Sequence, residues 1–300
     1  MKIGFIGLGL MGGPMAANLR KAGHALKVQD LRREAARELL AAGAQWSDAA
    51  AADVELVFTS LPGPREVQAV AGQILDAARP GTAWFDLSTN SPDVVRRIHV
   101  RCLEKQIHML DAPVSGGPTG AQSGRLALWV GGDRPTYDRC LPVLKAIGDE
   151  PFYVGPIGAG SVAKLVHNAS SFMVQAALAE AFTLGVKAGV EPLALFRALR
   201  QGATGRARTF DRLAEKFLPG TYDPAGFALH LAHKDVTLAL ELAKANGVPM
   251  RAGEHALAEL SEAMQRGWAE RDCRVAMTLQ EERAGVSVRV AADRLREALA

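Results

Sequence analysis

The feature that most limits what this chain can fold into is the run Gly7-Leu8-Gly9-Leu10-Met11-Gly12 near its start. The mostly apolar run Lys2–Ile6 before it predicts a short buried strand, and apolar positions at helical spacing after it predict a helix over Met11–Ala22. A second strand, Ala25–Asp30, ends on an acidic residue. This pattern predicts a dinucleotide site, because it combines glycines between a strand and a helix with an acidic residue at the end of the next strand.

Each glycine of this run has a separate physical task. We expect Gly7 to permit the tight turn, Gly9 to let the backbone approach a pyrophosphate, and Gly12 to allow close packing of the helix. Leu8, Leu10 and Met11 complete the cofactor loop, and the helix N-terminus offers free N–H groups to the anion. A glycine turn without any ligand is the alternative interpretation, which the strand–helix context disfavours.

The acidic residue at the end of the second strand bears on the choice of cofactor. Asp30 is expected to accept hydrogen bonds from the adenosine ribose hydroxyls, and apolar Leu31 follows it. A carboxylate at this place repels a 2′-phosphate, so the sequence favours NAD. Arg32 and Arg33 keep NADP open, although solvated residues before a helix are the simpler interpretation of both.

Strand and helix signals continue to alternate after residue 30. The expected helices are Glu34–Ala42, Glu66–Ala77, Pro92–Lys105 and Pro135–Ala146. The expected strands are Glu55–Ser60, Thr82–Asp86, His108–Asp111, Leu126–Val130 and Pro151–Val154. Such alternation predicts an α/β Rossmann-type domain, with a doubly wound parallel sheet covered by helices on both faces.

The character of the sequence changes at Ser161, after which Ala, Leu and Glu dominate and strand signals vanish. Amphipathic stretches predict helices over Ser161–Ala188, Lys234–Asn246 and Arg251–Arg266. Because 300 residues exceed the usual size of one core, we expect two domains. These are a dinucleotide-binding domain over 1–160 and an all-helical substrate and oligomerisation domain over 161–300, which begins with a long interdomain helix.

Two later loops are expected to complete the cofactor site. Leu61-Pro62 follows the strand Glu55–Ser60, and Ser88-Thr89-Asn90 follows the strand Thr82–Asp86. Open parallel sheets bind ligands at the carboxyl ends of their strands, where Thr89 can touch the nicotinamide or its ribose. Ordinary turn chemistry explains both loops equally well, since Pro, Ser and Asn are common turn residues.

Lys164 and Asn168 are the candidate catalytic residues. They stand four apart at the start of the long helix and therefore share one face. A lysine can take the proton of a substrate hydroxyl when burial and nearby positive charge lower its pKa. His167 lies near the same face of the helix, and it is a candidate residue for binding the substrate. Spacing alone favours the simpler interpretation, in which these are polar helix residues without a catalytic role.

Candidate groups for a substrate anion occur in two places. Asp111–Gly117 is a glycine-rich turn after a strand, and there Ser115 with the amides of Gly116 and Gly117 can cradle a carboxylate. Lys234, ahead of a later helix, is a second candidate cation for substrate and cofactor. The alternative interpretations are that Asp111–Gly117 is a tight loop without a ligand and that Lys234 is an ordinary lysine on a helix surface.

Charge and cysteine content exclude several classes of protein. The net charge is only +3, and without a long basic block nucleic acid is not expected as a partner. No apolar run reaches membrane-spanning length, and no signal peptide is recognisable. Cys102, Cys140 and Cys273 lack metal or redox spacing, so no metal is expected and a reducing cytoplasm is indicated.

Four segments resemble those of the β-hydroxyacid dehydrogenase family, which includes 3-hydroxyisobutyrate dehydrogenase and tartronate semialdehyde reductase. They are Phe5–Leu19, Asp111–Gly117, Gly158–Asn168 and Lys234-Asp235, the last preceded by Phe227 and Leu231. The resemblance implies that Lys164 is the general acid/base with Asn168 as its polar partner. It also implies that Ser115, Gly116 and Gly117 bind the substrate carboxylate, that Lys234 lies near nicotinamide and substrate, and that the chain forms a homodimer or homotetramer.

The resemblance implies hydride transfer between NAD and a small 3-hydroxy acid such as 3-hydroxyisobutyrate, or the semialdehyde in reverse. The pair His167-Asn168 departs from the Asn-Asn typical of 3-hydroxyisobutyrate dehydrogenases and resembles 6-phosphogluconate dehydrogenases, which leaves the substrate open. An NADP-dependent semialdehyde or imine reductase is the second hypothesis, and Lys164 counts against an imine reductase. A non-catalytic dinucleotide sensor is the third.

Overall fold

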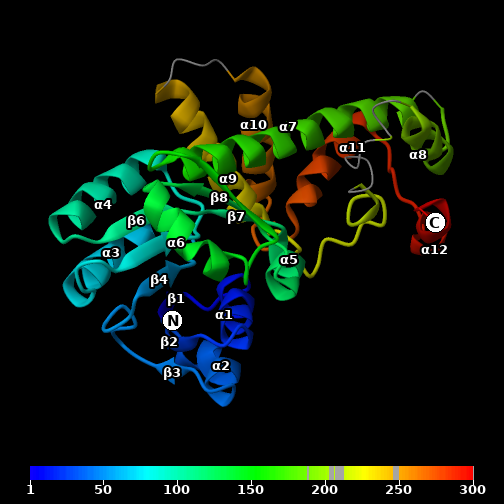
Figure 1. Ribbon diagram of the computed structural model, residues 1–300. Coiled ribbons are helices and arrows are strands. Elements are labelled where there is room, and N and C mark those ends of the chain that lie inside the picture. The colour runs from blue at the N-terminus through cyan, green and yellow to red at the C-terminus, as the bar shows by residue number, and fades with distance from the viewer. Residues whose placement is uncertain (188, 203–205, 207–212, 246–249, 300) are drawn as a thin grey trace. The chain divides into compact units, whose positions relative to one another are not determined.

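The computed structural model describes residues 1–187, 189–202, 206, 213–245 and 250–299 (Figure 1). The chain divides into two compact units, Met1–Val166 and His167–Ala300. The division lies inside one helix, α7 (Ala159–Lys187), whose 29 residues make it about 44 Å long.

The first unit is built on a nine-stranded sheet in the order β3-β2-β1-β4-β5-β6-β8-β7, with β9 paired to β8. The strands are β1 (Lys2–Ile6), β2 (Ala25–Gln29), β3 (Gln45–Trp46), β4 (Leu56–Thr59), β5 (Ala83–Asp86), β6 (His108–Asp111), β7 (Val114–Ser115), β8 (Ala127–Gly131) and β9 (Glu150–Gly155). The six strands from β3 to β6 are mutually parallel, whereas β8 runs antiparallel to β6 and β7. Their carboxyl ends therefore share one edge of the sheet.

Alternation along the strands explains why helices cover both faces of this sheet. In β4, Phe58 belongs to one apolar core and its neighbour Val57 to another, because successive side chains point to opposite faces. The first core includes residues of α1 (Gly12–Lys21), α2 (Arg37–Ala41), α5 (Gly117–Ser123) and α6 (Arg134–Leu144), and the second those of α3 (Pro64–Ala77) and α4 (Pro92–Glu104). The predicted doubly wound α/β fold is confirmed.

The sequence did not predict the shortest elements. β3 and β7 have two residues each, too few for a period of two to show. The stretch expected as one helix over Glu34–Ala42 is a 3-10 turn, η1 (Arg33–Ala36), followed by α2.

The second unit is helical in the residues that the structure describes, as predicted. After α7 it contains α8 (Pro192–Gln201), α9 (Leu229–Ala245), α10 (Arg251–Gln265), η3 (Cys273–Met277), α11 (Thr278–Ala284) and α12 (Ala292–Leu299). Phe172 of α7 packs in one apolar core with α9 and α10, and Phe182 packs in another with α8. The expected helix ends Ala188 and Asn246 lie outside the described residues.

The start of α9 differs from the sequence prediction. The helix begins at Leu229, not at Lys234, so that Lys234 lies in its second turn. The N–H of Leu229 donates to the carbonyl of Arg271 at 2.8 Å, and that of His230 donates to Ala269 at 3.1 Å. A distant segment therefore satisfies N–H groups at the start of the helix, which no local pattern reveals.

Within the described residues, none of the helices combines the length and the apolar character needed to span a membrane. Cys102, Cys140 and Cys273 are all buried thiols. Burial raises the pKa of Cys102 and of Cys273 to about 12.

Candidate active site

The glycine loop after β1 has the backbone geometry that its three glycines were expected to provide. Gly7 has a φ of +93°, and a Cβ there would lie 2.3 Å from the carbonyl oxygen of Ser60. A Cβ on Gly12 would lie 1.9 Å from the carbonyl oxygen of Gly7, so α1 packs directly on the loop. Gly9 differs from both, because it is exposed and a Cβ there would meet nothing within 4 Å.

This loop fits a bound dinucleotide. The open side of Gly9 lets a ligand approach the backbone closely, and α1 begins just beyond it. No side chain among the described residues caps the N-terminus of α1. Its N–H groups and the positive end of its dipole therefore suit a pyrophosphate. Within this loop Leu8 is buried, Met11 is half-buried, and Leu10 is exposed.

Asp30 follows β2 directly and is tied to the glycine loop. One carboxylate oxygen accepts the N–H of Leu8 at 2.7 Å, and the other accepts the N–H of Arg32 at 2.9 Å. The carboxylate is partly exposed, and Leu31 after it is fully exposed. The guanidinium of Arg33 lies 5.4 Å from the centre of the Trp46 ring, a cation–π contact.

The structure also brings together the two loops after β4 and β5. The N–H of Leu61 donates to the hydroxyl of Ser88 at 2.9 Å, which joins the loops at the edge where the glycine loop lies. Thr89 is half-buried next to this bond, and Pro62 is exposed. The predicted cofactor residues of the first unit therefore lie along the carboxyl ends of β1, β2, β4 and β5.

Asp86, at the end of β5, holds these loops in place through hydrogen bonds. The sequence analysis did not select it. Its buried carboxylate accepts the Thr59 hydroxyl at 2.9 Å, the Ser88 N–H at 3.2 Å and the Asn90 amide at 3.0 Å. Burial raises the pKa of Asp86, against the opposing effect of these hydrogen bonds. The sequence did contain a signal for Asp86, since it is a charged residue at the end of the apolar strand Ala83–Asp86.

The predicted substrate loop begins at the end of β6. Ser115 lies half-buried in β7, and Gly116 and Gly117 are exposed where α5 begins. Both glycines have positive φ, 136° and 62°, which favours glycine at these positions. Their backbone conformation is thus fixed by the turn, whatever the loop binds.

Lys164 lies in the second turn of α7 and is buried, with a relative exposure of 9%. Asn168 stands one turn further along the same helix and is 7% exposed. Buried Lys and Asn side chains are uncommon on helices, since both lose hydration there. The interpretation of Lys164 and Asn168 as ordinary solvated helix residues is therefore disfavoured.

In the second unit, Asn168 belongs to a cluster of polar side chains from α7 and α9. Its amide nitrogen donates to buried Asp235, and its amide oxygen lies 3.1 Å from Nδ1 of His167. The other carboxylate oxygen of Asp235 lies 2.9 Å from the ammonium of Lys234. Of the predicted site residues, Asn168 and Lys234 both bind Asp235, and His167 contacts Asn168. The sequence analysis assigned no role to Asp235.

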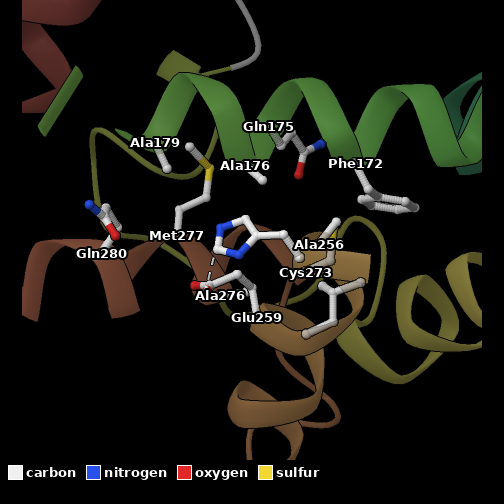
Figure 2. A pocket seen from close by; sticks show the side chains of 12 residues that line it. Phe172, Gln175, Ala176, Ala179, Ala256, Glu259, Cys273, Ala276, Met277 and Gln280 are labelled. Carbon is white, nitrogen blue, oxygen red and sulfur yellow. Dashed lines mark ion pairs between the residues drawn. The ribbon is translucent and has the colours of Figure 1, made fainter. Parts of the chain in front are cut away.

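The hollow drawn in Figure 2 also belongs to the second unit, where α7, α10, η3 and α11 line it. Phe172 and Ala176 of α7 contribute apolar surface, and His255 and Glu259 of α10 contribute polar atoms. The imidazole of His255 lies 3.9 Å from the Glu259 carboxylate, so these two polar groups lie together on the α10 side of the hollow.

Two protein-family models match the chain, one over most of the first unit and one over most of the second. Residues 2–155 match the model described as the NAD binding domain of 6-phosphogluconate dehydrogenase. Residues 158–279 match the model described as NAD-binding of NADP-dependent 3-hydroxyisobutyrate dehydrogenase. The chain belongs to the β-hydroxyacid dehydrogenase family. The resemblance seen in the sequence is confirmed.

Several named dehydrogenases are similar to this chain over almost its whole length. The 2-(hydroxymethyl)glutarate dehydrogenase of Eubacterium barkeri is 37% identical over 296 residues, which cover 96% of this chain and 97% of that protein. The NAD-dependent L-serine dehydrogenase of Pseudomonas aeruginosa is 37% identical over 93% of this chain and 97% of its own length. The structure of Mycobacterium tuberculosis 3-hydroxyisobutyrate dehydrogenase with L-serine has a TM-score of 0.85 at 33% identity, and covers 93% of this chain and 98% of that one.

This β-hydroxyacid dehydrogenase is an NAD(P)-dependent oxidoreductase that acts on the CH–OH group of a hydroxy acid. The general function predicted from the sequence is confirmed. The hypotheses of an imine reductase and of a non-catalytic sensor are correspondingly disfavoured.

Proposed function

We propose that this dehydrogenase transfers a hydride between NAD and a small 3-hydroxy acid, with Lys164 as general acid/base and Asn168 orienting the reacting oxygen. The observation that carries the proposal is the burial of both residues on one face of α7. Bound NAD supplies the acceptor for the hydride that leaves the carbinol carbon. In this assignment Lys164 Nζ takes the hydroxyl proton during oxidation and returns it during reduction.

Asn168 is suited to orient an oxygen because its own amide is held at both ends. Asp235 accepts one amide hydrogen, and His167 contacts the amide oxygen. In this assignment the second amide hydrogen donates to a substrate oxygen. A donor fixed in advance in this way costs little reorganisation when the reaction occurs.

We assign the substrate carboxylate to Ser115, Gly116 and Gly117, with Lys234 as a cation near substrate and cofactor and His167 as a further substrate ligand. The two glycines are exposed residues, and their backbone N–H groups can donate to an anion. Lys234 pairs with Asp235, so its ammonium is held near the amide of Asn168. Both arrangements support a small acid as the substrate.

We also propose NAD rather than NADP as the preferred cofactor. The Asp30 carboxylate stands next to the glycine loop, where it would accept ribose hydroxyls and repel a 2′-phosphate. Arg33, one of the two residues that kept NADP open, packs on the Trp46 ring. The L-serine dehydrogenase of Pseudomonas aeruginosa, to which the chain is 37% identical, is NAD-dependent.

Replacing Asp30 with Ala is expected to lower kcat/KM for NAD by about tenfold, through the loss of hydrogen bonds to a charged acceptor. The value for NADP is expected to rise, because the repulsion of its phosphate disappears. Initial rates with both cofactors test this, with Glu34→Ala as the exposed acidic control. An unchanged ratio of the two values in Asp30→Ala would contradict the assignment.

A substrate panel tests the reaction itself. NADH formation is followed at 340 nm with L-serine, 3-hydroxyisobutyrate, glycerate, 3-hydroxypropionate, 4-hydroxybutyrate and 2-(hydroxymethyl)glutarate, a range that includes the compounds named for the relatives. We expect the highest kcat/KM with a compound that carries its hydroxyl on the carbon β to the carboxylate. A clear preference for 4-hydroxybutyrate would contradict the 3-hydroxy acid.

We further propose that residues 1–160 bind the dinucleotide and that residues 161–300 serve substrate binding and assembly into a homodimer or homotetramer. Val174 and Val190 of the second unit expose 40% and 43% of their surface, apolar area that a second copy can cover. A cytoplasmic location is part of the proposal, in keeping with three reduced cysteines. Light scattering of the purified chain measures its oligomeric state.

A further inference from the structure

We propose that Asp111 is a positioning residue for the reaction, because its carboxylate fixes the start of the helix that carries Lys164. The inference rests on the proposed role of Lys164. One carboxylate oxygen of Asp111 accepts the N–H of Gly158 at 2.7 Å, and the other accepts the N–H of Ser161 at 2.6 Å. These partners are 47 and 50 residues away in the sequence, and all three residues belong to the first unit.

The two bonds replace a cap that the helix cannot make locally. The first turn of a helix has N–H groups without partners inside the helix, and a side chain at the preceding position usually accepts one of them. The N–H of Val162 donates to the carbonyl of Gly158 at 3.0 Å, which places Gly158 at that position. Since glycine has no side chain, the carboxylate from β6 takes over the task. Its negative charge also suits the positive end of the helix dipole.

The chain around Asp111 is shaped to seat this carboxylate. A Cβ on Gly131, its partner on the neighbouring strand β8, would lie 2.6 Å from the Asp111 carboxylate. A Cβ on Gly160 would lie 2.2 Å from the carbonyl oxygen of Trp129 and 2.8 Å from that of Asp111. Only glycine fits at either place, so two positions of the fold are constrained by the approach of α7 to the end of β6.

This contact joins the two parts of the first unit to which we assign the chemistry. Asp111 is the first residue of the 111–117 loop, which contains Ser115, and its side chain holds Ser161. Lys164 follows Ser161 by three residues, less than one helical turn. The position of Lys164 Nζ relative to the loop therefore depends on the two Asp111 bonds. A misplacement of about 1 Å in such a group can cost about a hundredfold in rate.

Asp111→Asn tests the proposal with a side chain of nearly the same size. Its amide has one acceptor oxygen, and its NH2 group would face one of the two N–H donors, so the first turn of α7 loosens. We expect kcat to fall about ten- to hundredfold, while the dissociation constant of NADH, measured by fluorescence titration, stays unchanged. Hydrogen exchange of the peptide spanning residues 156–165 should become faster.

Asp133→Ala is the matched control, because Asp133 caps α6 in the same unit by accepting the N–H of Thr136 at 2.9 Å. It should lose stability and retain kcat. A kcat loss in Asp111→Asn no larger than in Asp133→Ala would overturn the proposal, as would unchanged exchange at residues 156–165. Lys164→Met, assayed in parallel, separates the two failures. If that variant keeps its turnover, the assignment of Lys164 fails, whatever Asp111 does.

Discussion

Replacing Lys164 with Met is expected to lower kcat by about a hundred- to ten-thousandfold, the range that general acid/base groups usually contribute. Met fills nearly the same buried volume without an ionisable group, so the packing of α7 should survive. Binding of NADH is expected to stay near the wild-type level, because the proposed cofactor residues lie at the ends of β1, β2, β4 and β5. Steady-state kinetics and a fluorescence titration of NADH measure the two quantities separately.

Two further variants sharpen this test. Lys164→Arg keeps a positive charge but cannot release its proton, so it should be nearly as inactive as Lys164→Met if proton transfer is the role of the residue. If charge alone mattered, Lys164→Arg would recover much of the activity. Lys145→Met, at an exposed lysine of the same unit, is the control and should retain full turnover. Comparable rates in Lys164→Met and Lys145→Met would contradict the catalytic assignment.

The sequence predicted those parts of the molecule whose causes are local. The conformation of the glycine loop depends on a positive φ at Gly7 and on the absence of a side chain at Gly12, properties of single residues in the run. The doubly wound fold follows from apolar periodicities of two and 3.6, each visible within a few residues. Fold class and the conformation of the glycine loop were accordingly predictable without a structure.

The contacts that the sequence analysis missed join distant segments of the chain. Asn168 and Asp235 are 67 residues apart, and only the packing of α7 against α9 makes them partners. Asp86 and Asp111 end neighbouring strands of the sheet, paired in register. Each was visible as an acid that terminates an apolar strand. The groups that each one binds could not be read from spacing, because a buried carboxylate takes whatever donors the tertiary fold places around it.

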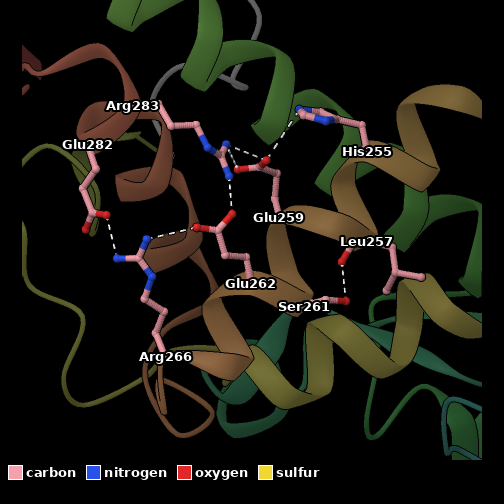
Figure 3. Close-up of polar contacts among 8 residues, drawn as sticks. All are labelled: His255, Leu257, Glu259, Ser261, Glu262, Arg266, Glu282 and Arg283. Atoms are coloured by element: carbon pink, nitrogen blue, oxygen red, sulfur yellow. Dashed lines mark hydrogen bonds and ion pairs between the residues drawn. The ribbon is translucent and has the colours of Figure 1, made fainter.

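Glu281 and Glu282 are adjacent acids on α11, yet their surroundings differ. The side chain of Glu281 is 5% exposed and binds the Arg289 guanidinium with both oxygens, at 2.9 and 2.6 Å. It also accepts the N–H of Val288 at 2.6 Å. The side chain of Glu282 is 49% exposed and contacts Arg266 at 2.6 Å (Figure 3).

Glu281→Ala is expected to lower the free energy of unfolding by about 3 kcal/mol, because it leaves the charge of Arg289 and the N–H of Val288 without their acceptor. The estimate takes the lower end of the usual range, since Arg289 is 36% exposed and water can partly replace the carboxylate. Glu282→Ala should cost about 1 kcal/mol or less, as surface ion pairs do. Both variants replace Glu with Ala on α11, so the change in helix propensity is the same in each. The difference between their losses in unfolding free energy therefore measures the effect of burial.

Urea unfolding of the two variants, with Arg289→Ala and the double variant Glu281→Ala/Arg289→Ala, measures the pair directly. The double variant should lose less than the sum of the single losses, because removing both charges leaves neither one unpaired. Equal losses in Glu281→Ala and Glu282→Ala would show that the buried pair adds nothing. The outcome also bears on the proposed site, since α11 packs in the apolar core that contains Leu229 and Val236 of α9, the helix of Lys234 and Asp235. Loss of the Glu281 contacts should therefore lower the temperature at which activity disappears while leaving kcat at 25 °C unchanged.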